Sequence, residues 1–217
     1  MRPIVTTVTA AAANANGYAT TQSLGAVGPL TLNGSLVTAG VGVPASPCRV
    51  TITSAGNDTG ITWTIVGTSN AALGSIPLTE VLLGKNGVVV TSTQDFAKVA
   101  SITASGATAS TVTAGTSATT SSNWVPWDVN QTDFLLSMAG VVNSEAATWQ
   151  VEYTYDPIYT MLGTGAAPFP TAFVYGVLSG KTTNADGAFT LPVTATRLTL
   201  TALGSVTLTQ VQQGSGR

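Results

Sequence analysis

The residue types that usually carry out catalysis are scarce in this chain. It has no histidine, and its 217 residues include 7 Lys and Arg and 9 Asp and Glu. Histidine is the commonest general base, metal ligand and pH switch, so the usual means of acid–base chemistry is missing. The single cysteine, Cys48, cannot form an internal disulfide or a thiolate zinc cage. The composition therefore favours a structural or binding role over an enzymatic one.

Two pairs of carboxylates could serve as a glycosidase site: Asp128 with Asp133, or Glu145 with Glu152. Polar and apolar residues alternate through 148–155, which places Glu152 on the face opposite the aromatic residues. That pattern is typical of a solvated face and not of a pocket that shifts a pKa. The pairs therefore give little support to catalysis.

Other catalytic and metal-binding patterns are equally weak. A Ser or Thr nucleophile would need a lysine as its base, and the three lysines lie in contexts typical of a surface. The turn 57–60 contains one carboxylate, whereas calcium sites usually recruit several. We expect no catalytic residue, no cofactor and no metal.

The elements that must carry any site are strands. Threonine and apolar residues alternate with a period of two, which is typical of half-buried strands; the runs are 49–53, 61–66, 197–201 and 206–211. Clusters rich in Gly, Asn and Asp punctuate the runs and favour tight hairpins; they lie at 55–60, 84–87, 184–187 and 203–205. The sequence predicts an all-β protein made of two small antiparallel β-sandwich units, jelly-roll-like in type.

Small polar residues at 114–123 suggest a Ser/Thr-rich linker or crossover between the two units. We place the boundaries at 1–23 for an N-terminal arm or first strand, 24–116 for the first unit, 117–123 for the linker and 124–217 for the second unit. The start of the chain is either a strand of its own domain or an arm that adds to another subunit's sheet.

A faint internal similarity links the two units. Residues 49–57 can be laid on residues 197–205, and each segment continues into another alternating run. Gene duplication and shared turn chemistry explain this similarity equally well.

Two aromatic features could anchor a partner. Trp124 and Trp127 lie three residues apart, and such tryptophans pack at a junction, anchor a partner or stack on sugars. The segment 159–175 reads as a long loop with aromatic tips, and long loops in compact domains usually form contacts. With the start of the chain, these features give our interface candidates: Trp124, Trp127, Tyr159, Phe169, Phe173, Tyr175, Arg2, Ile4 and Val5.

Several stretches resemble small structural proteins of tailed-bacteriophage virions, of the capsid cement or decoration type or the neck or tail type. The second unit carries the resemblance in 124–134, 148–157 and 184–198, and the chain start carries it in 2–6. Residues 52–60 and 63–68 are similar to another β module of phage structural proteins. The resembling motifs are strand and turn patterns and not catalytic signatures, and the resemblance implies a virion component.

From this resemblance we expect a capsid cement protein that binds the major capsid protein, or other virion proteins, and stabilises the shell. We expect a homo-oligomer, with a trimer favoured, that is made in the host cytoplasm. The low and balanced charge argues against nucleic acid, and no stretch approaches the roughly 20 apolar residues of a membrane span. The alternatives are a neck or tail component, or a carbohydrate-binding module that uses Trp124, Trp127 and residues 159–175.

Overall fold

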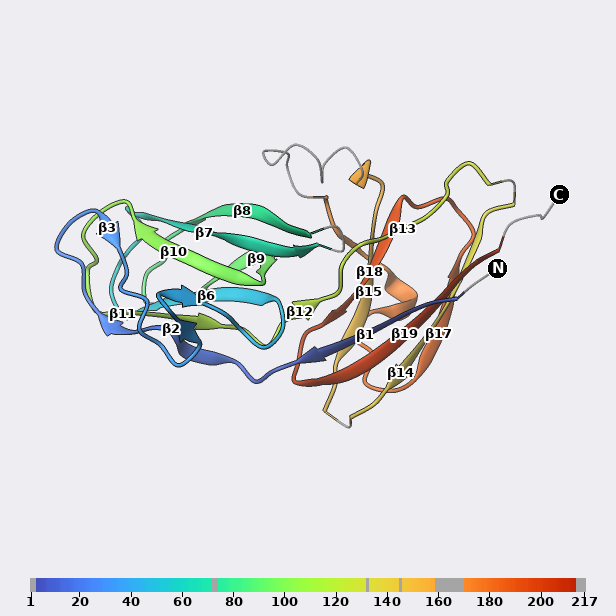
Figure 1. The fold of residues 1–217 in the computed structure, drawn as a ribbon, viewed down its shortest axis with the longest axis horizontal. Helices are drawn as coiled ribbons and strands as arrows, with labels where there is room; N and C mark the ends of the chain where they lie inside the picture. The colour runs from blue at the N-terminus through green and yellow to red at the C-terminus, as the bar shows by residue number, and fades with distance from the viewer. Residues whose placement is uncertain (1–2, 72–73, 132, 145, 159–169, 214–217) are drawn as a thin grey trace. The chain divides into compact units, whose positions relative to one another are not determined.

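The fold is described from a computed structural model of the chain (Figure 1). The described residues are 3–71, 74–131, 133–144, 146–158 and 170–213. Antiparallel β-strands dominate them, so the prediction of an all-β protein is confirmed.

The chain divides into two compact units. Unit 1 contains residues 1–10 and 119–217, and unit 2 contains residues 11–118. Unit 2 is therefore inserted into the chain of unit 1, between strand β1 (Ile4–Ala10) and strand β12 (Thr120–Ser121).

This division differs from the expected boundaries in two places. The segment 1–23 is not one element, because β1 pairs with β19 (Gly204–Gln213) in unit 1, whereas β2 (Asn14–Gln22) pairs in unit 2. Within the expected linker, the buried residues Thr120 and Ser121 form β12 and pair with β18 (Ala195–Leu200). Strand partners far apart in the sequence decide both outcomes, about 200 residues for β1 with β19 and about 80 for β12 with β18, and local composition does not reveal them.

Unit 2 is built from two antiparallel sheets. One has the order β4-β5-β10-β7-β8, with β3 also paired to β10, and the other has the order β2-β11-β6-β9. Large buried side chains come from both sheets, among them Ile52, Trp63 and Phe96, so the core lies between them. The remaining strands are β3 (Gly28–Pro29), β4 (Val37–Thr38), β5 (Val41–Gly42), β6 (Cys48–Ser54), β7 (Thr62–Ala71), β8 (Gly74–Leu83), β9 (Val90–Phe96), β10 (Lys98–Ala104) and β11 (Val112–Thr116).

Unit 1 is a second sandwich. Its sheets have the orders β1-β19-β14-β17 and β12-β18-β15-β16, and β13 also pairs with β18. One hydrophobic cluster joins them, with Leu136 and Leu208 from the first sheet and Trp149 and Leu198 from the second. The remaining elements are β13 (Val125–Pro126), β14 (Leu135–Val142), β15 (Trp149–Thr154), β16 (Phe173–Val174), β17 (Ala185–Phe189) and the 3-10 turn η1 (Gly176–Leu178).

Some predicted turns act differently from expectation. The turn 55–60 joins β6 to β7, and the predicted turn 203–205 overlaps the start of β19 where the chain passes from β18 to β19; each connects strands of opposite sheets. They are therefore crossovers and not hairpins, because turn residues mark a reversal without choosing the sheet. The expected turn 184–187 is largely strand, since Gly187 lies in β17 opposite Met138.

Candidate interaction site

Five aromatic side chains form a continuous cluster at one edge of unit 1. We call Tyr153, Tyr155, Phe173, Tyr175 and Phe189 the aromatic cluster. Ring centroids are 5.6 Å apart for Tyr153 and Phe173, 5.2 Å for Tyr153 and Phe189, and 4.1 Å for Tyr175 and Phe189. The rings come from β15, β16 and β17 or the residues next to them, so both sheets contribute.

The aromatic cluster runs from the core to the surface. Phe189 belongs to the hydrophobic core, and Tyr153 and Tyr175 pack against that core. Tyr155 and Phe173 expose 55% and 45% of their surface. The exposed rings of Tyr155 and Phe173 are therefore held in contact with water by neighbouring rings that pack in or against the core.

The backbone around the cluster is fixed by hydrogen bonds. The Tyr175 hydroxyl donates to the Ala188 carbonyl at 2.7 Å, and the Tyr175 N–H donates to the Val151 carbonyl at 2.8 Å. A carboxylate oxygen of Asp156 accepts from the Thr171 N–H at 2.6 Å, just before β16. These bonds join the edges of the two sheets and hold Phe173 in place before any partner arrives.

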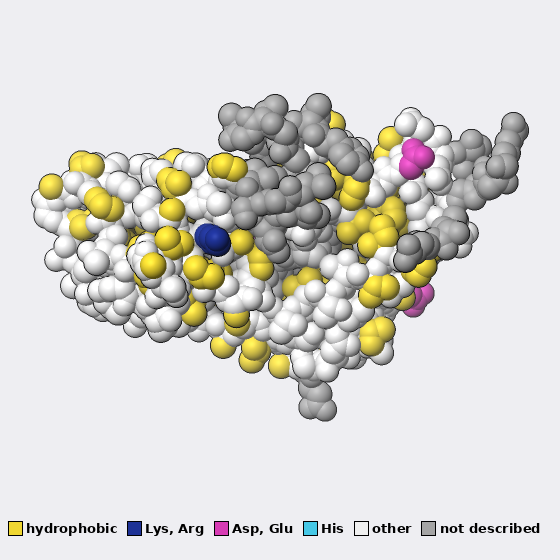
Figure 2. All heavy atoms as spheres, in the orientation of Figure 1, with side chains coloured by type: hydrophobic (Ala, Val, Ile, Leu, Met, Phe, Trp, Pro, Cys, Tyr) yellow, Lys and Arg dark blue, Asp and Glu magenta, His cyan; other side chains and the backbone are white. Residues whose placement is uncertain are grey.

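This arrangement suits recognition better than catalysis. Aromatic rings bring a large contact area at a low entropy cost and are enriched in the centres of protein interfaces. Few charged side chains appear on the face of the molecule drawn in Figure 2, where apolar side chains are scattered among polar ones. Such a surface makes contacts without stripping water from many ions.

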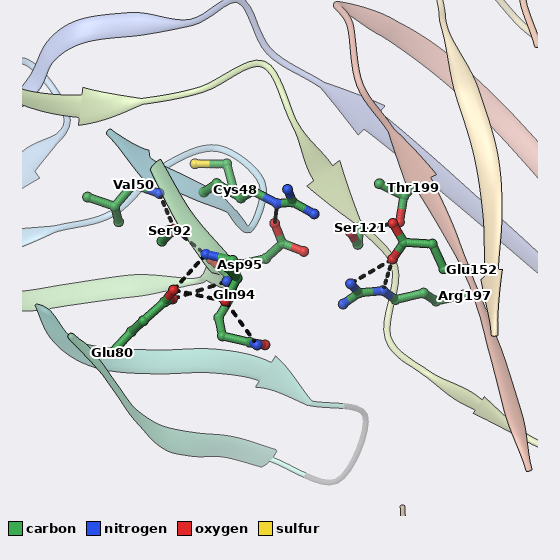
Figure 3. A network of polar contacts seen from close by, with 12 residues as sticks. Cys48, Val50, Glu80, Ser92, Gln94, Asp95, Ser121, Glu152, Arg197 and Thr199 are labelled. Carbon is green, nitrogen blue, oxygen red and sulfur yellow. Dashed lines mark hydrogen bonds and ion pairs between the residues drawn. The ribbon is translucent and has the colours of Figure 1, made fainter. Parts of the chain in front are cut away.

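An ion pair in unit 1 corrects the expectation that Glu152 lies on a solvated face. Glu152 is 4% exposed, and its Oε2 accepts from Nε and Nη2 of Arg197, both at 2.7 Å (Figure 3). The Gln150 side-chain amide donates to the other carboxylate oxygen at 2.9 Å. Alternation identified the face correctly, but it could not show that the face is buried.

Burial alone would raise the pKa of Glu152, but the Arg197 charge and hydrogen bonds from Arg197, Gln150 and Thr199 lower it below its ordinary value. The Arg197 guanidinium carbon also lies 4.7 Å from the centre of the Trp124 ring. The pair is a satisfied structural element whose carboxylate is charged at neutral pH, and this is unsuitable for a general acid.

The internal similarity of 49–57 and 197–205 aligns Arg49 with Arg197, but it does not indicate which carboxylate each arginine faces. Arg197 lies opposite Glu152 in the register of β18 and β15, and Arg49 lies opposite Asp95 in the register of β6 and β9. Arg49 Nε is 3.9 Å from Asp95 Oδ1 (Figure 3). Each arginine therefore faces a carboxylate across a strand pair.

The two predicted tryptophans serve unit 1 internally. Trp127 is 9% exposed, belongs to the hydrophobic core and donates its indole N–H to Thr196 Oγ1 at 2.8 Å. It is not available to a partner, which corrects its selection as an interface candidate. Trp124 is half-buried and covers Arg197.

The other interface candidates fall into two groups. Phe173 and Tyr175 belong to the aromatic cluster, while Ile4 and Val5 lie on β1 and are exposed by 39% and 59%. The structure does not bring these two groups together as one site. Three candidates lie outside the described residues: Arg2, Tyr159 and Phe169. Tyr155, which the sequence reasoning placed on the inward face, is the most exposed member of the cluster.

Unit 2 has its own polar network, in which Glu80 of β8 reaches β9 of the opposite sheet. Its carboxylate accepts from the Thr93 N–H at 2.7 Å and from the Gln94 N–H at 3.1 Å (Figure 3). There β9 bulges, and Ser92 Oγ accepts from the Val50 N–H at 2.8 Å. Glu80 thus links the two sheets of unit 2 by hydrogen bonds from its side chain.

Within the described part of the chain, no group of three or more His, Cys, Asp or Glu is placed to hold a metal ion. Nor does any helix in that part have the length and apolar character to cross a membrane. Comparison with family models, with curated proteins and with solved structures finds no match for this chain.

Proposed function

We propose that this protein is a structural component of a tailed-bacteriophage virion, a cement or decoration protein that binds the major capsid protein lattice. The observation that carries the proposal is the aromatic cluster, whose exposed rings Tyr155 and Phe173 form a pre-organised contact surface. The resemblance of 124–134, 148–157 and 184–198 to phage virion proteins supplies the kind of partner.

The physical properties of the chain support this role. Only 7% of its residues are charged, against about a quarter in ordinary soluble domains. A weakly charged surface gives little protection against association, which suits a protein that spends its life assembled. Repetition over a lattice also multiplies modest contacts, so each site needs no exceptional affinity.

The proposal is tested by co-sedimentation of the purified protein with empty shells of the major capsid protein. The test variant is Tyr155→Ser/Phe173→Ser, which removes both exposed rings. The matched control is Leu83→Ser, because Leu83 of β8 is 64% exposed and belongs to the other unit. Far-UV circular dichroism shows whether each variant keeps its fold.

We expect the wild type and Leu83→Ser to sediment with shells. Loss of two interface aromatic residues typically costs at least about 2 kcal/mol, so the double variant should bind at least about 30-fold more weakly. A wild type that ignores the shells overturns the proposal, and so does a double variant that binds as well as wild type.

The two alternatives give distinct results. A neck or tail component would be present at about a dozen copies or fewer per particle, against several hundred for a shell protein. A carbohydrate-binding module would bind a glycan array and lose that binding in the same Tyr155→Ser/Phe173→Ser variant, since exposed aromatic rings also stack on sugars.

A further inference from the structure

Strand β1 presents an open edge. In its sheet, β1 is the outermost strand and lies beside β19 (Figure 1). It pairs with β19 alone, over seven residue pairs. No hydrogen bond from the other side of β1 is present among the described residues. An edge strand of this kind exposes a row of backbone N–H and C=O groups that can pair with another strand.

The composition of β1 offers no protection against such pairing. Its sequence, IVTTVTA, contains no charge, no proline and no glycine. Six of these seven residues are β-branched and fit a pleated sheet well. Segments of this kind are the ones that add readily to other strands.

The other long edge strands of the described chain do carry protection. Strand β8 contains Pro77, which removes a donor, and strand β17 contains Asp186 and Gly187. Strand β9 is bulged, and the Glu80 carboxylate occupies two of its N–H groups. Charges, prolines and bulges are the usual devices that keep edges apart.

Strand β2 is protected by its own chain. The Tyr18 carbonyl accepts from the N–H groups of Asn33 and Gly34, and the Gly17 carbonyl accepts from the Leu36 N–H. The remaining edge strands β4, β12 and β16 have two residues each. Among the described strands, β1 alone combines length with an undefended edge.

The sequence of β1 is also complementary to itself. If two copies pair antiparallel with Thr7 at the centre, all seven residues find a partner, with Val5 opposite Thr9 and Ile4 opposite Ala10. No like charges meet, and the exposed Val5 gains a neighbour. Thr7 and Thr9 already form hydroxyl pairs with Thr207 and Ser205 of β19, at 2.9 and 3.1 Å. Threonine pairs across strands are favourable, and the new junction continues this pattern.

We propose that β1 pairs with β1 of a second copy of this chain about a two-fold axis at Thr7, joining two four-stranded sheets into one continuous sheet. The occupant is a second copy because an antiparallel pair of identical strands closes with two-fold symmetry and satisfies both open edges at once. The inference is independent of the proposed binding to capsids.

The direct test is a cysteine cross-link. In Thr7→Cys, the two new thiols would meet on the axis, where opposed Cα atoms lie about 4.5–5.5 Å apart, within the range of a disulfide. Mild oxidation should give a covalent dimer on a non-reducing gel. The controls are the wild type, whose Cys48 is buried, and Thr209→Cys, which lies on the same sheet but one strand further in.

A second variant tests the interface without chemistry. Thr7→Lys places like charges opposite each other across the axis, which weakens strand pairing. We expect a wild-type mass of twice 21.8 kDa by light scattering at micromolar concentration. The dissociation constant of the dimer should be at least tenfold higher in Thr7→Lys than in wild type, and unchanged in Thr209→Lys.

Three results overturn the inference. One is a wild type that stays at 21.8 kDa, with no cross-link in Thr7→Cys. Another is a trimer, or any other oligomer, in which Thr7→Cys does not cross-link. The third is a Thr7→Lys variant that loses binding to shells while its mass stays unchanged, because this result would assign the edge to a strand of the shell. Should Thr7→Lys fail to fold, the cross-link alone decides.

Discussion

Replacing Arg197 by leucine should destabilise unit 1 by about 3–5 kcal/mol, because the Glu152 carboxylate then stays buried without its counter-charge. The two side chains are 10% and 5% exposed and share two contacts of 2.7 Å. Replacing both residues by leucine removes the unpaired charge together with its partner. The double variant should therefore lie within about 1 kcal/mol of wild type, far from the sum of the single changes.

Urea unfolding of the full chain, followed by tryptophan fluorescence, measures these differences. Trp124, Trp127 and Trp149 belong to unit 1, whereas Trp63 belongs to unit 2, so a Trp63→Phe background reports unit 1 alone. In this background the fluorescence change follows the unfolding of unit 1, which is fitted as its own two-state transition.

The matched control is Arg49→Leu. The Arg49 side chain is 26% exposed and its Nε lies 3.9 Å from Asp95, so its loss should cost on the order of 1 kcal/mol or less. The reasoning is refuted if Arg197→Leu costs no more than Arg49→Leu. It is also refuted if the double variant loses the full sum of the two single losses, since the pair would then be uncoupled.

Three further predictions follow from groups already described. Because the pKa of Glu152 is lowered in the folded state, the stability that its charge contributes is complete above the unfolded pKa and is lost as pH falls through the folded pKa. The free energy of unfolding, measured at decreasing pH, should therefore fall less steeply in Glu152→Gln than in wild type. Burial raises the pKa of Cys48 to about 11, so a thiol reagent at pH 8 should label the native chain far more slowly than the chain in urea. Glu80→Ala leaves the N–H groups of Thr93 and Gln94 without their acceptor, so urea unfolding should show that unit 2 loses about 1–3 kcal/mol of stability. Glu80→Gln keeps an acceptor oxygen and should lose less stability than Glu80→Ala.

Local patterns predicted the strands well because alternate side chains of a strand point to opposite faces, so the strand's own sequence shows which face is apolar. The alternation in 49–53 matches the strict inward and outward burial of β6, and that in 148–155 correctly turned Trp149 and Val151 inward. Together with the turn clusters, this alternation predicted an all-β chain correctly. These properties depend on neighbours in the sequence.

The pairing of strands was beyond reach, because it depends on residues far apart. Nothing near Glu152 announces that Arg197, 45 residues later, will lie opposite it. Nor does the segment 4–10 reveal that its partner is 204–210. The expected arm 1–23 is divided between the two units for this reason, because the partner of its first strand lies at the other end of the chain. The second break between the units, after residue 118, falls within the expected linker 117–123.

The aromatic cluster was found in part. Phe173 and Tyr175 were chosen from their place in a long loop, and the structure confirms their exposure or partial exposure. Tyr155 was assigned to an inward face, which holds for Tyr153 but ends where the strand ends at Thr154. Beyond the last strand residue, alternation no longer reports direction.

The pairing of β1 with β19 has a consequence during translation. Unit 2 is complete once residue 118 has left the ribosome, whereas the first sheet of unit 1 needs residues up to 213. Until residues 204–210 are made, β1 has no partner strand on either of its edges. On a polysome, neighbouring nascent chains would hold many such strands close together, and their encounter is where assembly, or misassembly, of this protein would begin.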